Sequence, residues 1–142
     1  MGQTPLPLSI RTKGSRMLYA IICYHSEAVV NAWSKEKDDA VMAHHQEVLG
    51  KIAAKGKLGP TARLMPTTTA TTVRPGRQQL TVLDGPFAET KEQLLGFFII
   101  DCESLEEAIE YAKQLVVDEG VMEVRPVMVS NTGVLNFGSA VR

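Results

Sequence analysis

The residues best suited to acid–base chemistry are a histidine on a helix and an aspartate at the end of a strand. His45 falls in the middle of the apolar stripe of the helix expected over 33–55, between Val41 and Leu49. Asp84 ends a strand-like run and is followed by Gly-Pro. A histidine that lines a pocket and is oriented by a carboxylate is suited to general base or acid catalysis. We therefore predict His45 and Asp84 as a catalytic pair.

Both residues also have a structural interpretation. An imidazole on a buried helix face needs a hydrogen-bond partner, and a backbone carbonyl supplies one, so His45 is also interpretable as a core histidine. An aspartate before Gly-Pro is also typical of an Asx-type turn, which needs no site at all. The sequence leaves these alternatives open.

Three further residues are candidates for contacts with a substrate. Phe87 is expected to anchor the loop after Asp84 by burying its ring. Lys91 belongs to a charged stretch, 89–92, that is otherwise interpreted as a solvated face. Arg125 can offer its guanidinium to an anionic ligand, to a partner subunit or to a structural ion pair, and the ion pair is the favoured interpretation.

Several other chemistries find no support in the sequence. The neighbouring side chains of His44 and His45 point about 100° apart on a helix, so they do not share one metal ion without help. Glycine-rich phosphate loops and the G-x-S-x-G motif are absent. Cys23 and Cys102 lie far apart in apolar runs and are interpreted as free, buried thiols. We expect no metal and no cofactor.

Composition limits the partners. The chain has 142 residues, a formal net charge of −1 and 6% aromatic residues, which does not favour nucleic acid binding. Apolar stretches of the roughly 18–20 residues that span a membrane are absent, so we expect no membrane partner and, by default, a cytoplasmic location. A small-molecule ligand of unknown identity remains as the expected partner.

The order of the expected elements indicates one α+β domain. Residues 1–16 are expected to be a disordered extension, 17–129 the domain and 130–142 a loose tail. The expected elements are a strand over 17–24, a connection over 25–31, a helix over 33–55, a strand over 58–64, a hairpin over 67–83, a strand over 94–102, a helix after the capping box of Ser104 and Glu107, and a strand over 121–129. This β-α-β, hairpin, β-α-β order predicts a ferredoxin-like sandwich, with Pro126 placing the last strand at an edge.

Such a sheet carries both helices on one face. The other face would expose a large apolar patch unless something covered it. We therefore predict a homodimer whose sheets pack face to face.

Three stretches, DGPFAETKEQLLGFFIID, SLEEAIEYA and MEVRPVMV, resemble the DGPF-domain family within the YCII-related group. Upstream, GKLGPTARLMP and TTVRPG are similar to the same family. The resemblance covers about 17–129 and implies a ferredoxin-like domain that assembles as a dimeric α+β barrel. It also implies a catalytic pair of a helix histidine and an acid, for which His45 and Asp84 are the matching candidates. Where the family often has a small residue, this chain has Leu95, which would narrow a pocket.

Three functions compete on this basis. The first is a cofactor-independent enzyme in which His45 is the acid or base and Asp84 holds its tautomer. The second is a ligand-binding or regulatory dimer without turnover; some family members belong to regulatory systems beside alternative sigma factors. The third is a purely structural dimer, in which the DGPF motif packs an interface.

Overall fold

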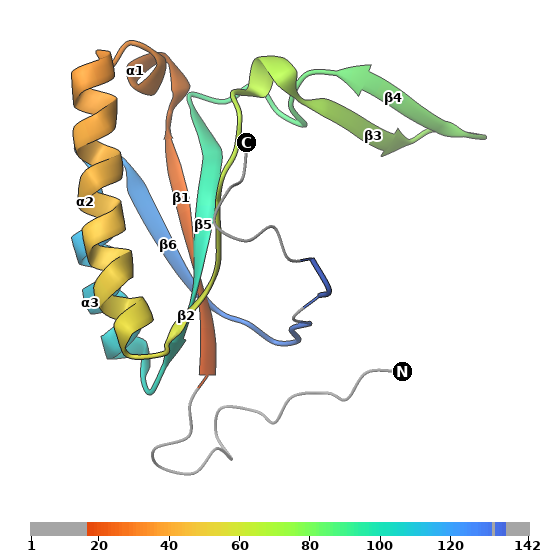
Figure 1. Ribbon diagram of the computed structural model, residues 1–142. Helices are drawn as coiled ribbons and strands as arrows, with labels where there is room; N and C mark the ends of the chain where they lie inside the picture. Colours follow the sequence, from red (N-terminus) through yellow and green to blue (C-terminus); the bar gives the residue numbers. More distant parts are fainter. Residues whose placement is uncertain (1–16, 132, 136–142) are drawn as a thin grey trace.

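A computed structural model describes residues 17–131 and 133–135 (Figure 1). The expected N-terminal extension, 1–16, and most of the expected C-terminal tail lie outside the described residues. The elements are β1 (Met17–Ser26), α1 (Glu27–Asn31), α2 (Lys35–Ala54), β2 (Leu58–Arg63), the 3-10 helix η2 (Thr67–Thr69), β3 (Thr71–Pro75), β4 (Leu80–Asp84), β5 (Glu92–Cys102), α3 (Leu105–Leu115) and β6 (Val121–Pro126).

The main sheet has four strands in the order β2-β5-β1-β6, and every neighbouring pair is antiparallel. This mixed α+β arrangement is compatible with the predicted ferredoxin-like fold. β6 is an edge strand, as the proline at position 126 requires, because proline has no N–H to donate to a further strand. β2 is the other edge, and its register shifts between Leu58 and Thr61, which flank a Gly-Pro pair.

Serine caps begin the helices. The side chain of Ser34 accepts from the backbone N–H of Lys37 and starts α2, while Ser104 accepts from the N–H of Glu107 and starts α3. The predicted capping box is half formed, because the Glu107 carboxylate accepts from the N–H of Glu103 rather than of Ser104. Glu107 also pairs with Lys57 at 3.0 Å, which ties the start of β2 to α3.

The core lies between the sheet and the two long helices, which cover the same face of the sheet (Figure 1). Its fully buried side chains include Ile21 of β1, Ile52 of α2, Ile100 of β5 and Leu115 of α3. Alternation along β1 and β5 sends every second side chain into this core, as expected for a sheet covered on one face.

Three local predictions were wrong. The segment 25–31 is not a plain connection: β1 runs on to Ser26, whose side chain caps the short helix α1 by accepting from the N–H of Val29. The segment 67–73 is not one strand, because Thr67–Thr69 form a 3-10 turn after Pro66. The last strand ends at Pro126 rather than at 129, since Val127 N–H makes a single bond to the Leu18 carbonyl and pairing stops there.

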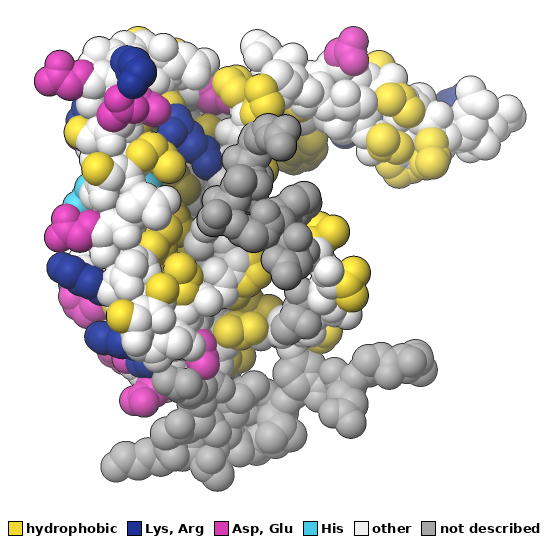
Figure 2. Space-filling view, in the orientation of Figure 1, with side chains coloured by type: hydrophobic (Ala, Val, Ile, Leu, Met, Phe, Trp, Pro, Cys, Tyr) yellow, Lys and Arg dark blue, Asp and Glu magenta, His cyan; other side chains and the backbone are white. Residues whose placement is uncertain are grey.

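The predicted hairpin is present as a second, two-stranded sheet made of β3 and β4, which we call the arm (residues 71–84). It projects from one end of the main sheet on the side away from the helices (Figure 1). Val73 pairs with Val82 and Pro75 with Leu80, so one face of the arm is apolar. These side chains are exposed, and Figure 2 shows hydrophobic groups along the arm.

Candidate functional site

A cavity of about 130 Å³ lies between α2 and the sheet, near the end of the sheet where β1 runs into α1. Its walls come mostly from apolar side chains of α2, β1, β5 and the loop after α3. A few polar side chains interrupt those walls. The lining residues are Cys23, His25, Val30, Trp33, Val41, Met42, His45, Gln46, Leu49, Thr61, Ala62, Arg63, Leu95, Gly96, Phe98, Val117, Gly120 and Met122. A largely apolar pocket with a few convergent polar groups is the usual form of a small-molecule site.

His45 lines this cavity from the middle of α2 and is half-buried. Its Nε2–H donates to the backbone carbonyl of Leu115 at 2.9 Å, and its ring meets the Phe98 ring edge-to-face at 5.6 Å. Next to it, His44 Nε2 bonds the carbonyl of Gln114 at 2.7 Å. Two successive histidines therefore satisfy two of the carbonyls that the end of α3 leaves without helical partners.

The bond to Leu115 fixes the tautomer of His45. A carbonyl oxygen only accepts, so Nε2 carries the proton and, in the neutral ring, Nδ1 holds the lone pair. Burial lowers the pKa of His45; the Leu115 carbonyl raises it, while His44 and Arg63 lower it further. His45 is therefore neutral at pH 7. Nδ1 makes no hydrogen bond within the described residues, which leaves it as a proton acceptor.

His25 lines the same cavity from the end of β1 and is only 3% exposed. Its Nε2 is buried and has no hydrogen-bond partner among the described residues. The Trp33 ring meets the His25 ring edge-to-face at 5.8 Å. On another side lies Gly120, where an added Cβ would come within 2.8 Å of the His25 Cδ2. The sequence placed His25 in a loop and missed it.

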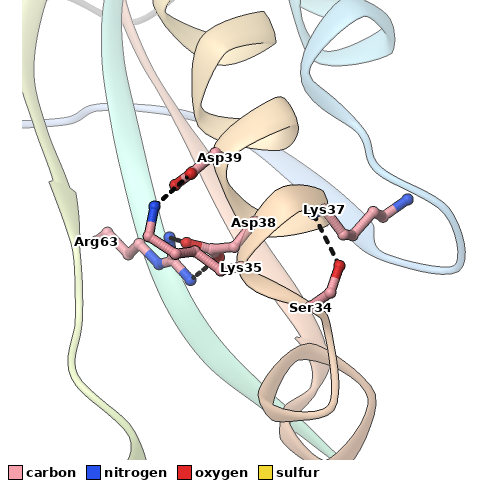
Figure 3. A network of polar contacts seen from close by, with 6 residues as sticks. All are labelled: Ser34, Lys35, Lys37, Asp38, Asp39 and Arg63. Carbon is pink, nitrogen blue, oxygen red and sulfur yellow. Dashed lines mark hydrogen bonds and ion pairs between the residues drawn. The ribbon is translucent and has the colours of Figure 1, made fainter.

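An ion pair borders the cavity at the start of α2. The Arg63 guanidinium, from β2, holds the Asp38 carboxylate through both nitrogens at 2.7 and 3.4 Å (Figure 3). Its hydrogen bond lowers the pKa of Asp38. Because Arg63 already has a carboxylate partner, the one charged side chain among the described residues that line the cavity is paired within the protein.

Both cysteines are free thiols, as predicted. Burial raises the pKa of Cys23, which lines the cavity, and raises that of Cys102 to about 11. Thiols with raised pKa values stay protonated at pH 7 and are poor nucleophiles. Cys23 therefore contributes to the wall rather than to chemistry.

Asp84 lies at the end of β4 on the arm, opposite Thr71, and is exposed. It is absent from the cavity lining, and the described residues show no contact between Asp84 and His45. Gly85 follows with a φ of 109°, a conformation that favours glycine, and donates its N–H to the Ala70 carbonyl. Thr72 Oγ1 in turn donates to the Gly85 carbonyl at 2.7 Å. These bonds turn the chain back at the base of the arm through backbone groups and Thr72, and the Asx-type turn at Asp84 stays a prediction.

The three predicted substrate contacts lie elsewhere than the cavity. The prediction that Phe87 buries its ring was wrong: the ring is 75% exposed and lies 5.7 Å from the guanidinium of Arg74, which also donates to the Phe87 carbonyl. Lys91 is exposed near the start of β5. Arg125 forms the favoured structural ion pair, at 3.1 Å to Glu123.

Within 17–131 and 133–135, no group of three or more His, Cys, Asp or Glu side chains is placed to hold a metal ion. Over the same residues, no helix is long and apolar enough to cross a membrane.

An α+β domain with one antiparallel four-stranded sheet, two covering helices and a cavity lined by a helix histidine defines the class of this protein. Residues 17–131 match the family model described as a YCII-related domain, so the chain belongs to the YCII-related family. It is 52% identical over 122 residues to an uncharacterised protein from Rhizobium meliloti (strain 1021), covering 84% of this chain and 98% of that protein. The DGPF resemblance fits within this family.

Proposed function

We propose that the protein binds a compact, mainly apolar metabolite in the cavity beside His45. The observation that carries this proposal is the combination of apolar walls with a neutral histidine whose Nδ1 has no partner within the described residues. A cavity of about 130 Å³ is comparable to the roughly 150 Å³ engineered cavity that holds one benzene molecule. The ligand is therefore about the size of a single ring.

A titration with one-ring fragments, followed by amide chemical shifts, tests this function. Binding is expected to move the amide signals of Gly96 and Gly120, which line the cavity, and to leave Val82 on the arm unchanged. Cys23→Leu enlarges a side chain that lines the cavity from β1 and is expected to weaken binding, whereas the control Val82→Leu leaves it unchanged. Shifts confined to the arm, or equal binding by both variants, would contradict the proposal.

Acid–base catalysis in the same cavity is a second candidate function, and the fixed tautomer of His45 favours it. Nδ1 is an acceptor held in place by the Leu115 carbonyl, so it can remove a proton from a bound substrate without a carboxylate partner. The test is turnover of a ligand found in the fragment titration. His45→Gln is expected to retain binding and lose turnover; a ligand that stays unchanged after long incubation supports binding alone.

We also propose that two copies pair through the face of the sheet that carries no helix. Ile22 pairs with Phe97 and Ala20 with Ile99 on this face, and all four are apolar and only half-buried. The apolar arm projects on the same side (Figure 1), so one partner subunit would cover both surfaces.

Light scattering measures the mass of the protein directly. The wild type is expected to be a dimer, and Ile22→Glu is expected to be a monomer, because it places two like charges in the shared face. Val29→Glu on α1, which lies outside this face, is the matched control and is expected to remain a dimer. A monomeric wild type would contradict the proposed pairing.

A further inference from the structure

The buried imidazole of His25 carries a nitrogen that has no hydrogen-bond partner among the described residues. It is the only buried side chain there whose nitrogen or oxygen has no hydrogen-bond partner. Leaving such a group unpaired is energetically unfavourable, so native proteins rarely keep one without a reason. A site that receives a ligand is one such reason, since the partner is then supplied by the ligand.

Local packing keeps His25 in place. Its ring lies between Trp33 on one side and Gly120 on another, and a Cβ at position 120 would lie 2.8 Å from His25 Cδ2 and 3.0 Å from the Val117 carbonyl. Gly120 N–H donates to that same carbonyl at 2.8 Å, which closes the turn before β6. Trp33 is held from outside by Lys37, whose ammonium lies 5.5 Å from the ring and pairs with Asp118 at 3.0 Å. The ring of His25 is therefore enclosed on several sides and borders the cavity, while Nε2 itself is covered by its neighbours, so a ligand reaches this nitrogen only when the enclosing side chains shift.

The charges around the cavity select a neutral ligand. Arg63 is already paired with Asp38, and His45 is neutral because burial lowers its pKa. An ionised ligand would have no free opposite charge in these walls, and burying an unpaired charge is strongly unfavourable. The walls instead suit an apolar body with a polar group that can both donate and accept, as a hydroxyl does.

We propose that His25 is the recognition residue for a neutral, one-ring-sized ligand, and that a small shift of the enclosing side chains lets its Nε2 take the hydroxyl group of that ligand. This inference rests on the proposed cavity function and adds the residue and the ligand class to it. His45 then faces the bound molecule as a second polar group, and the apolar walls contact its body.

Phenol and toluene are the probes, because they have nearly the same shape and differ in one hydroxyl. Their affinities are compared by amide shift titration in the wild type, His25→Leu and His25→Gln. The wild type is expected to bind phenol about five- to tenfold more tightly than His25→Leu does, the size of one lost hydrogen bond. Toluene is expected to bind both proteins alike. His25→Gln, which keeps a polar group at this position, is expected to restore part of the phenol affinity.

Direct observation of the ring nitrogens does not depend on a variant that folds. In wild-type protein labelled with ¹⁵N, the His25 Nε2 signal is expected to move on addition of phenol and to stay unchanged with toluene. If the two probes bind equally and the Nε2 signal does not move, His25 is not the recognition residue, although the cavity proposal stands. If neither probe shifts the Gly96 and Gly120 amides, both proposals are wrong.

Discussion

The cavity and the arm differ in what surrounds their polar groups. In the cavity, His45 and His25 lie among residues from two helices and four strands, and the tautomer of His45 is fixed. Asp84 at the end of the arm and Phe87 just after it are exposed. Enclosure in an apolar medium is what shifts a pKa and strengthens a hydrogen bond. The pKa of His45 is shifted in this way.

This difference assigns separate roles to the two regions. The DGPF segment, the most conspicuous motif in the sequence, uses its glycine and its backbone bonds to reverse the chain at the base of the arm. The cavity is built from less conspicuous positions. The following predictions test whether the cavity and the arm respond to substitution as differently as this account requires.

The largest effect is expected at the glycine that makes room for His25. Gly120→Ala brings a Cβ into the His25 ring and the Val117 carbonyl, and is expected to lower the free energy of unfolding by about 1–3 kcal/mol. Gly50→Ala in α2 is the matched control: outside the backbone of its own helix and its chain neighbours, nothing lies within 4 Å of the added Cβ, and helix propensity favours alanine by roughly 0.5–1 kcal/mol. Urea unfolding measures both; equal effects would contradict the packing described for His25.

The next effect separates the two neighbouring histidines. His45→Ala removes a half-buried hydrogen bond and the contact with Phe98, and is expected to lower the free energy of unfolding by about 1–2 kcal/mol. His44→Ala removes a similar bond at an exposed position, where water replaces it, and is expected to cost less than about 0.5 kcal/mol. A larger loss of unfolding free energy for His44→Ala than for His45→Ala would contradict the assignment of the half-buried, hydrogen-bonded position to His45.

Acid is expected to destabilise the protein through His45. The unfolded chain titrates this residue with the ordinary histidine pKa of about 6.5, whereas burial lowers the pKa in the folded protein. The unfolded state therefore binds more protons as the pH falls below about 6.5, and the contribution of neutral His45 is lost as the pH falls through the folded pKa. Unfolding by urea at pH 7.5 and pH 5.5 is expected to show a smaller pH dependence in His45→Ala. An unchanged dependence would contradict the lowered pKa.

The smallest effect is expected on the arm. Val82 is 65% exposed, so Val82→Ala is expected to change the free energy of unfolding of the monomer by no more than about 0.5 kcal/mol. The same substitution at Val48, buried in α2, removes two buried methyl groups and is expected to cost about 2 kcal/mol. Ile22→Glu serves as the monomeric background for both measurements. Similar losses at the two positions would mean that the arm packs as tightly as the core.

Periodicity and caps predicted the architecture well because they are local signals. The apolar spacing of α2, the Ser104 cap of α3 and the edge position of Pro126 each depend on residues close in the chain. The same spacing placed His45 on the inner face of its helix, and Leu95 does line the cavity.

The rest of the site depends on contacts between distant segments. His25 follows an apolar run and precedes a serine, which suggests a loop, and its burial comes from Trp33 and Gly120. Arg63 lies on an edge strand, and only the fold brings it to Asp38. The predicted pairing of His45 with Asp84 came from the conspicuous DGPF motif. Among the described residues, the hydrogen-bond partner of His45 is instead the backbone carbonyl of Leu115. That pairing stays a prediction whose carboxylate would have to come from a second subunit.

The titration of His45 by NMR, in the wild type and in Asp84→Asn, tests most directly whether this histidine works in the cavity independently of the arm. The account predicts a pKa below the ordinary value of about 6.5 that is unchanged by the substitution, because burial is its main cause. A raised pKa that drops in Asp84→Asn would contradict it, and would place the arm carboxylate of a second subunit beside His45.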